Sequence, residues 1–201
     1  MKHTFLFLAA ASALTLAACQ NAPPAELPPP IAQPAPQPST PVAPPQQIVP
    51  AGPLTQASVG RYMDALERDL RLRLRGSGIA VARRGDDMLL TFPNTRLFAS
   101  ESLSPSGQGV LGSVAQVLRR YDHTQVQVNS YTDTSGSPEQ NLAVSQKRAA
   151  LVGDALARSG IAAARIEAHG FGEANLKVAT GDHVNEPRNR RIELRITARP
   201  G

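Results

Sequence analysis

The sequence predicts an α/β (α+β) fold, a two-layer sandwich in which a mixed β-sheet packs against helices. Helix-period and strand-period segments alternate along residues 54–201, which is the order expected of such a sandwich. Residues 20–53 instead hold most of the chain's 18 prolines and a single charged residue, Glu26. Because that stretch cannot bury a core, we expect a disordered Pro-rich tether ahead of the folded part.

The chain opens with the pattern of a secretion signal. A short basic start precedes an apolar run, Phe5 to Leu16, and small residues follow it. The run is shorter than the roughly 20 residues of a membrane-spanning helix, which argues against a permanent transmembrane segment. It ends in the string Leu16-Ala17-Ala18-Cys19, which resembles a bacterial lipobox. We therefore expect a lipoprotein signal peptide at residues 1–18.

Cys19 is the predicted site of lipidation. It is the only cysteine in the chain, so an intrachain disulfide is excluded. A protein with two or more acyl chains, such as palmitate, is anchored stably, whereas one chain holds it only marginally. Gln20, in place of Asp, resembles the sorting signal of outer-membrane lipoproteins. The expected location is the outer membrane, with the folded domain facing the periplasm; a secreted protein with one free thiol is the alternative.

Residues 19–53 are interpreted as the lipidated cysteine and its linker. Proline-rich chains populate the extended polyproline II conformation, so this segment could span about 100 Å at about 3.1 Å per residue. The runs Pro23-Pro24 and Pro28-Pro29-Pro30 leave a proline-recognition motif as the alternative.

Residues 54–85 are expected to form a helix and the start of a β-hairpin. Apolar residues recur at helical spacing, and arginines and aspartate occupy the other face. The apolar set is Val59, Tyr62, Met63, Leu66 and Leu70. The alternating run Leu70 to Arg75 indicates that the helix ends there, before Gly76-Ser77-Gly78. Two strand signals, Ile79–Ala82 and Met88–Phe92, then predict the hairpin.

The region 86–201 is expected to form the main domain. Ser104-Pro105 starts a helix whose buried face is predicted to consist of Val110, Leu111, Val114, Val117 and Leu118. A short strand is predicted at Arg165–Ala168, followed by Gly170-Phe171-Gly172 and a polar loop to about Arg188. The alternation of Ile192, Leu194 and Ile196 predicts a final strand.

The stretch from Val126 to Val152 reads as strand, polar loop and helix. Ser137 is the expected N-cap, with Pro138 at the first helical position and Gln140 closing a capping box. We expect a buried helix face made of Leu142, Ala149, Val152 and Leu156. We expect a flanking polar stripe made of Asn141, Ser145 and Arg148.

This layout places the Asp133 carboxylate ahead of a helix N-terminus and the Arg148 guanidinium inside the same helix. Arg148 lies roughly 15 Å along the axis, but its side chain leans back toward the N-terminus. A ligand that carries both an ammonium and a carboxylate could bind between the two, and Asn141 could orient it. In the alternative interpretation, Asp133 only binds loop amides and Arg148 is an ordinary solvated residue.

Four sequence blocks, in order, are similar to those of the OmpA-like peptidoglycan-binding domain family. They are the string Thr132 to Gly136, the run Asn141 to Ala149, Gly170-Phe171-Gly172, and Asn189-Arg190-Arg191-Ile192. The helix and hairpin before them also resemble those of some lipoproteins of this family. The chain departs from the family at Ser130-Tyr131, where a small residue is usual, at Leu142 to Ser145, where the Leu-Ser step is longer, and at Ala99, which replaces an aspartate.

The resemblance implies non-covalent binding of peptidoglycan through the diaminopimelate of its stem peptide. Asp133 would then bind the ammonium and Arg148 a carboxylate, both facing solvent. Asn141 and Thr132 would orient the stem peptide, and Arg190 or Arg191 would line the pocket. The implied function is to tether the outer membrane to the cell wall, alone or as the wall-anchoring subunit of a secretion or division machine.

Other classes of protein are less consistent with the sequence. The formal charge of +5 becomes +4 once Lys2 is removed with the signal, but aromatic residues for base stacking are few, and helix-turn-helix and zinc-finger patterns are lacking. The histidines have no metal-ligand spacing, so we expect no metal and no cofactor. Asp133 and Glu139 could be the carboxylate pair of a glycan hydrolase, but Arg148 favours binding over catalysis. We therefore expect no enzyme and no nucleic-acid partner.

Overall fold

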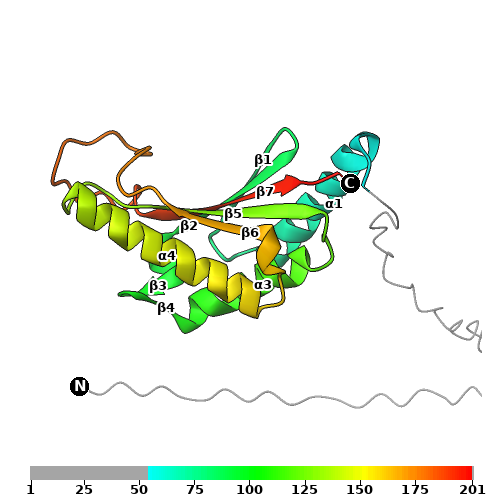
Figure 1. Ribbon diagram of the computed structural model, residues 1–201, viewed down its shortest axis with the longest axis horizontal. Helices are drawn as coiled ribbons and strands as arrows, with labels where there is room; N and C mark the ends of the chain where they lie inside the picture. Colours follow the sequence, from blue (N-terminus) through cyan, green and yellow to red (C-terminus); the bar gives the residue numbers. More distant parts are fainter. Residues whose placement is uncertain (1–53, 201) are drawn as a thin grey trace, which may run out of the picture. The chain divides into compact units, whose positions relative to one another are not determined.

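A computed structural model of the chain describes residues 54–200 (Figure 1). The predicted signal peptide, Cys19 and the Pro-rich tether lie outside these residues. After a short 3-10 turn at Gln56–Ser58, helices and strands alternate as expected, but residues 94–103 add a short helix and a two-stranded hairpin that the sequence did not predict. They are α1 (Val59–Arg73), β1 (Ala80–Arg84), β2 (Asp87–Pro93), α2 (Asn94–Leu97), β3 (Phe98–Ala99), β4 (Ser102–Leu103), α3 (Pro105–Leu118), β5 (Thr124–Tyr131), α4 (Pro138–Arg158), a 3-10 turn (Ala163–Arg165), β6 (Ile166–Gly170) and β7 (Arg191–Ala198).

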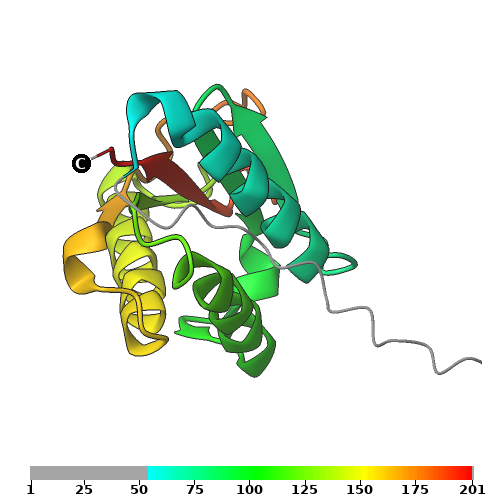
Figure 2. The same ribbon diagram turned by 90° about the vertical axis from the view of Figure 1, so that its right-hand side faces the viewer.

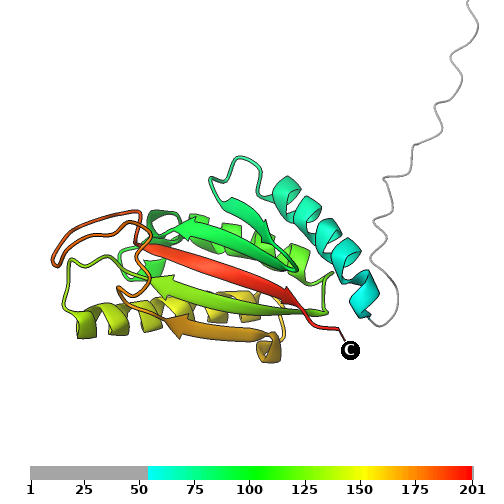
Figure 3. The same ribbon diagram turned by 90° about the horizontal axis from the view of Figure 1, so that it is seen from above.

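The five long strands form one mixed sheet in the order β1-β2-β7-β5-β6. β5 and β6 are parallel, with Val128 opposite Ala168, and every other pair in this sheet is antiparallel. Figure 3 looks onto the sheet with α3 and α4 behind it, and Figure 2 shows these two helices on the same side. The predicted two-layer sandwich with a mixed sheet is confirmed.

One hydrophobic core joins the helices to the inner face of the sheet. Alternate residues of β2, β5 and β7 point into it, which confirms the period-2 pattern, and their neighbours are partly exposed. The predicted apolar face of α1 is fully buried, and so is that of α3 apart from the half-buried Val110. Among the described residues no helix is both long and apolar enough to cross a membrane.

The predicted start of α4 is confirmed. Ser137 and Gln140 form the reciprocal capping box, and Pro138 occupies the first turn. The cap satisfies backbone N–H groups that have no partner inside the helix. Asn141, Ser145 and Arg148 lie on the first three turns that follow this cap.

One part of the predicted buried face of α4 is wrong. Leu142 is 43% exposed, whereas Asn141 and Ser145 of the supposed flanking stripe are buried. The cause is the segment after β6, which lies against the first turns of α4: the Gly172 N–H donates to Ser145 Oγ at 2.8 Å. At Gly170 an added Cβ would lie 2.2 Å from the backbone nitrogen of Gln146, so this close approach requires glycine.

Candidate functional site

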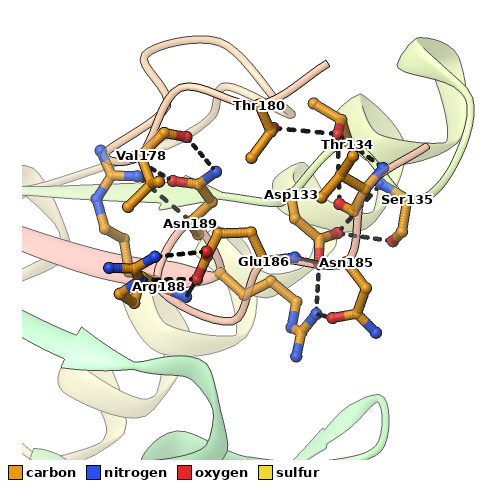
Figure 4. A network of polar contacts seen from close by, with 12 residues as sticks. Asp133, Thr134, Ser135, Val178, Thr180, Asn185, Glu186, Arg188 and Asn189 are labelled. Atoms are coloured by element: carbon orange, nitrogen blue, oxygen red, sulfur yellow. Dashed lines mark hydrogen bonds and ion pairs between the residues drawn. The ribbon is translucent and has the colours of Figure 1, made fainter. Parts of the chain in front are cut away.

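Asp133 lies in the loop between β5 and α4 and is only 2% exposed. Its Oδ1 accepts from Ser135 Oγ at 2.7 Å, and its Oδ2 accepts from the Glu186 N–H at 3.1 Å (Figure 4). Arg190 donates to the same Oδ2. The expectation that Asp133 faces solvent is therefore wrong, because the loop between β6 and β7 covers it.

Charge and hydrogen bonding keep Asp133 ionised despite its burial. Burial alone would raise the pKa of Asp133, but the hydrogen bonds from Ser135 and Arg190 outweigh it, and the pKa lies below its ordinary value. A carboxylate held in this way is an acceptor with a fixed position and a fixed charge.

Arg148 projects from the third turn of α4 and is partly buried. Its guanidinium carbon lies 5.7 Å from the centroid of the Phe98 ring. Within residues 54–200 the guanidinium makes no hydrogen bond or ion pair, so it is not bonded to Asp133. Burial lowers the pKa of Arg148, nearby Arg190 lowers it further, and Asp133 and Glu101 oppose this shift. Asp133 is thus close enough to act on Arg148 electrostatically without contacting it.

Asn141 and Thr132 lie beside the same loop. Asn141 Nδ2 donates to Glu173 Oε2 at 2.7 Å, and the Thr132 N–H donates to the Gly172 carbonyl at 2.7 Å. The Thr132 side chain is 2% exposed, and its Oγ1 has no hydrogen-bond partner among residues 54–200. A buried hydroxyl without a partner is costly, which makes it a candidate contact for a ligand.

Arg190 and Arg191 have different environments. Only Arg190 contacts Asp133, and it also donates to Asn185 Oδ1. The Arg191 guanidinium carbon lies 3.9 Å from the centroid of the Tyr131 ring, and its nitrogens donate to Glu193 Oε1 at 2.7 Å and to the Asn175 carbonyl at 3.0 Å. Arg191 therefore fastens the β6–β7 loop, whereas Arg190 contacts Asp133 directly.

Two further residues that sequence reasoning missed hold this loop in place. Thr134 Oγ1 donates to the Gly181 carbonyl at 2.7 Å and accepts from the Val184 N–H at 3.2 Å. Asn189 is buried and exchanges hydrogen bonds of 2.8 and 2.9 Å with the backbone of Val178 (Figure 4). Both lie in the blocks that carry the family resemblance, which was the available signal.

The assembled site presents one carboxylate and two guanidiniums within electrostatic range of one another. Asp133 supplies a negative group, Arg148 a positive group without an acceptor among the described residues, and Arg190 a second positive group. A zwitterion matches this arrangement better than a simple cation or anion does. Among the described residues no cluster of three or more His, Cys, Asp or Glu could hold a metal ion.

The fold and these blocks define a known class of domain. Residues 97–190 match the OmpA family, so the chain carries a domain of that family. A protein named probable lipoprotein YiaD, from Escherichia coli (strain K12), is 40% identical over 141 residues, which cover 69% of this chain and 64% of the relative. A protein of Mycobacterium bovis, named peptidoglycan-binding protein ArfA, is 33% identical over 93 residues, covering 46% of this chain and 28% of the relative.

A solved structure has the same architecture. The cell wall anchor of the T6SS from Pseudomonas aeruginosa is 28% identical, with a TM-score of 0.57 over 66% of this chain and 96% of that one. The chain spans less than two thirds of the length of the two curated relatives named above.

Proposed function

We propose that this protein is an outer-membrane lipoprotein that binds peptidoglycan non-covalently and tethers the membrane to the cell wall. The ligand is the diaminopimelate of the stem peptide. The names of the mycobacterial relative and of the Pseudomonas wall anchor support a cell-wall ligand. Diaminopimelate suits these residues because it carries an ammonium, which Asp133 could bind, and a carboxylate, which Arg148 could bind, on the same carbon.

The observation that carries this proposal is the state of Arg148. A partly buried guanidinium has lost part of its hydration and has gained no hydrogen-bond acceptor from the described residues in return. A ligand carboxylate would supply that acceptor, in a bidentate geometry for which arginine is suited. The ligand ammonium would share Asp133 with Arg190.

The remaining site residues would orient the stem peptide. The Thr132 hydroxyl can donate to a ligand oxygen or accept from a ligand N–H, and it has no competing partner among residues 54–200. The Asn141 amide, already bonded to Glu173, leaves its carbonyl oxygen for the ligand. Arg190 would line the site beside Asp133, whereas Arg191 acts through the loop that it fastens.

The test is a double-mutant cycle on sacculus binding. Asp133→Asn and Arg148→Gln should each weaken binding of the chain to purified sacculi by about thirtyfold or more. The double variant should lose little beyond either single variant, because one ligand must satisfy both groups together. Free diaminopimelate should compete with sacculi for the wild type. If Arg148→Gln binds sacculi like the wild type and keeps its melting temperature, the proposal fails at its central residue.

The membrane anchor is the second part of the proposal. Residues 1–18 would be removed, Cys19 lipidated, and residues 20–53 would connect it to the helix-and-hairpin segment (54–85) and the peptidoglycan-binding domain (86–201). Cys19→Ala should release the protein from the membrane fraction or leave the signal uncut. A variant that still sediments with outer membranes at normal mature mass would contradict the anchor.

A role as the wall-anchoring subunit of a larger machine is the second candidate, favoured by the likeness to the T6SS wall anchor. A hydrolase is disfavoured by the electrostatics of the site. A glycosidase needs one carboxyl group with a raised pKa as its general acid, whereas the pKa of Asp133 is lowered and its carboxylate is paired with Arg190.

A further inference from the structure

The outer surface of α1 carries a group of arginines that the proposed peptidoglycan site does not use. We call this surface, together with the adjoining end of α3, the arginine face. It consists of Arg68, Arg71, Leu72, Arg73, Arg75, Arg119 and Arg120. Leu72 is 59% exposed, more than any other large apolar side chain among the described residues.

Two hollows meet at Leu72. One, of about 580 Å³, lies between α1 and α3 and is lined by Arg73, Arg119 and Arg120. The other, of about 410 Å³, is lined by residues along α1 and just beyond its end, including Arg68, Arg71 and Arg75. Leu72 lines both hollows, so an exposed apolar side chain stands between two groups of three guanidiniums.

Most of this positive charge is not neutralised by neighbouring acids. Arg71 pairs with Glu67 at 2.7 Å, and Arg120 pairs with Asp69 at 3.1 Å. No ion pair within residues 54–200 involves the other four arginines of the face, which are Arg68, Arg73, Arg75 and Arg119. Asp64, which lines the second hollow, pairs with Arg83 instead. The face therefore has a clear excess of positive charge.

The arginine face is separate from the proposed peptidoglycan site. In Figure 3 the loop between β6 and β7, which covers Asp133, lies at one end of the sheet, and α1 lies toward the other end. Within the part of the chain that the structure describes, no hydrogen bond or ion pair joins Arg68, Arg71, Arg73, Arg75 or Arg119 to a residue of the site. Changes on the face should therefore leave the site intact.

We propose that the arginine face binds the surface of an anionic phospholipid bilayer. Guanidiniums bind phosphate oxygens in bidentate geometry, and each cationic side chain near an anionic lipid surface adds to the affinity. Leu72 would enter the boundary between headgroups and acyl chains, while the arginines around it stay at headgroup level. The charges spread along two hollows rather than converge on one point, which suits a surface of many phosphates better than one small anion.

This inference is independent of peptidoglycan binding. It concerns a different surface, a different ligand and different residues, and it would hold if the sacculus experiment failed. Its consequence is that the folded domain has its own contact with a membrane, in addition to any lipid at Cys19.

The experiment is vesicle cosedimentation with residues 20–201. This chain lacks Cys19 and the apolar run and keeps every residue of the core, Leu54 to Ala198. It should bind vesicles that contain about one third phosphatidylglycerol in phosphatidylcholine. It should not bind vesicles of pure phosphatidylcholine, and salt should weaken the binding.

Two charge-matched variants isolate the face. Arg73→Gln with Arg119→Gln should weaken binding to the anionic vesicles roughly twentyfold, and Leu72→Gln should weaken it less. The control is Arg84→Gln with Arg199→Gln, which removes the same charge from exposed positions outside the face and should bind like the wild type. Thermal unfolding and sacculus binding should be unchanged in both doubles, which shows that the fold and the other site are intact.

Several results would overturn the proposal. One is a wild-type chain that fails to bind the anionic vesicles, and another is a wild-type chain that binds vesicles of pure phosphatidylcholine equally well. The third such result is an equal loss of vesicle binding in the two double variants. If inorganic phosphate or polyglutamate binds the arginine face while the anionic vesicles do not, the ligand is a small anion or an acidic protein and the bilayer proposal is wrong.

Discussion

Among residues 54–200, two buried carboxylates have nearly equal exposure but different surroundings. Asp69 in α1 is 3% exposed and Asp133 in the site is 2% exposed. Asp69 accepts from the Tyr121 hydroxyl at 2.8 Å and from Arg120 at 3.1 Å, which joins α1 to the segment after α3. Asp133 is also hydrogen-bonded, but beside it lie the Arg148 guanidinium, which has no hydrogen-bond or ion-pair partner among residues 54–200, and the Thr132 hydroxyl, which has no hydrogen-bond partner there.

The comparison of Asp69 with Asp133 shows that burial and ion pairing do not by themselves mark a binding site. Around Asp69 the polar groups satisfy one another, so the arrangement stabilises the packing of the helices. Around Asp133, the partly buried Arg148 guanidinium and the buried Thr132 hydroxyl find no hydrogen-bond partner among residues 54–200. A ligand could supply those partners. The predictions below test this distinction.

The largest effect is expected for Asp69→Ala. The change leaves the buried Tyr121 hydroxyl without its acceptor, so the free energy of unfolding should fall by about 2–4 kcal/mol. Denaturant unfolding measures this loss, and sacculus binding per folded molecule should not change. Asp64→Ala is the control on the same helix, since that acid is exposed and should cost less than about 1 kcal/mol. If Asp69→Ala loses little stability but no longer binds sacculi, then Asp69 is the binding residue, and the structural role given to it here is wrong.

The pH dependence of Asp133 should be the next largest effect. Its folded-state pKa is lowered, so the stability it contributes is present above the unfolded pKa, about 3.9, and is lost as the pH falls through the folded pKa. The difference in unfolding free energy between wild type and Asp133→Asn should be constant near neutral pH and shrink below about pH 4. Sacculus binding should likewise persist to about pH 4. If the difference in unfolding free energy between the wild type and Asp133→Asn stays constant below about pH 4, Asp133 is not the titrating group.

The smallest effect is expected for Thr132→Val. The hydroxyl has no partner among residues 54–200, so its removal should leave stability unchanged or slightly higher. Sacculus binding should fall about fivefold if the ligand uses the hydroxyl. Thr134→Val is the matched control, because its hydroxyl binds Gly181 and Val184 and its loss should cost about 1–2 kcal/mol. Equal stability losses in the two variants would mean that Thr132 is only structural.

Much of the fold could be predicted because its signals are local. The capping box of Ser137 and Gln140 and the alternation of Ile192, Leu194 and Ile196 depend on residues a few positions apart. Each pattern can be read from residues close together in the sequence, and the elements lie close to where they were expected.

For the candidate site, the sequence named residues but not how they lie relative to one another. The sequence by itself determined that an acid, an amide and two arginines would lie on a strand–loop–helix unit and at the start of the last strand. Only the tertiary structure decided their geometry. Arg190 ends the β6–β7 loop and Arg191 begins β7, so the pairing of β7 with β5 and β2 placed Arg191 against Tyr131 and left Arg190 beside Asp133. Residues 178–189 covered Asp133, and the backbone of Gly170 to Gly172 buried the polar stripe of α4 instead of Leu142. These contacts join segments from about 25 to about 110 positions apart, so no local period could show them.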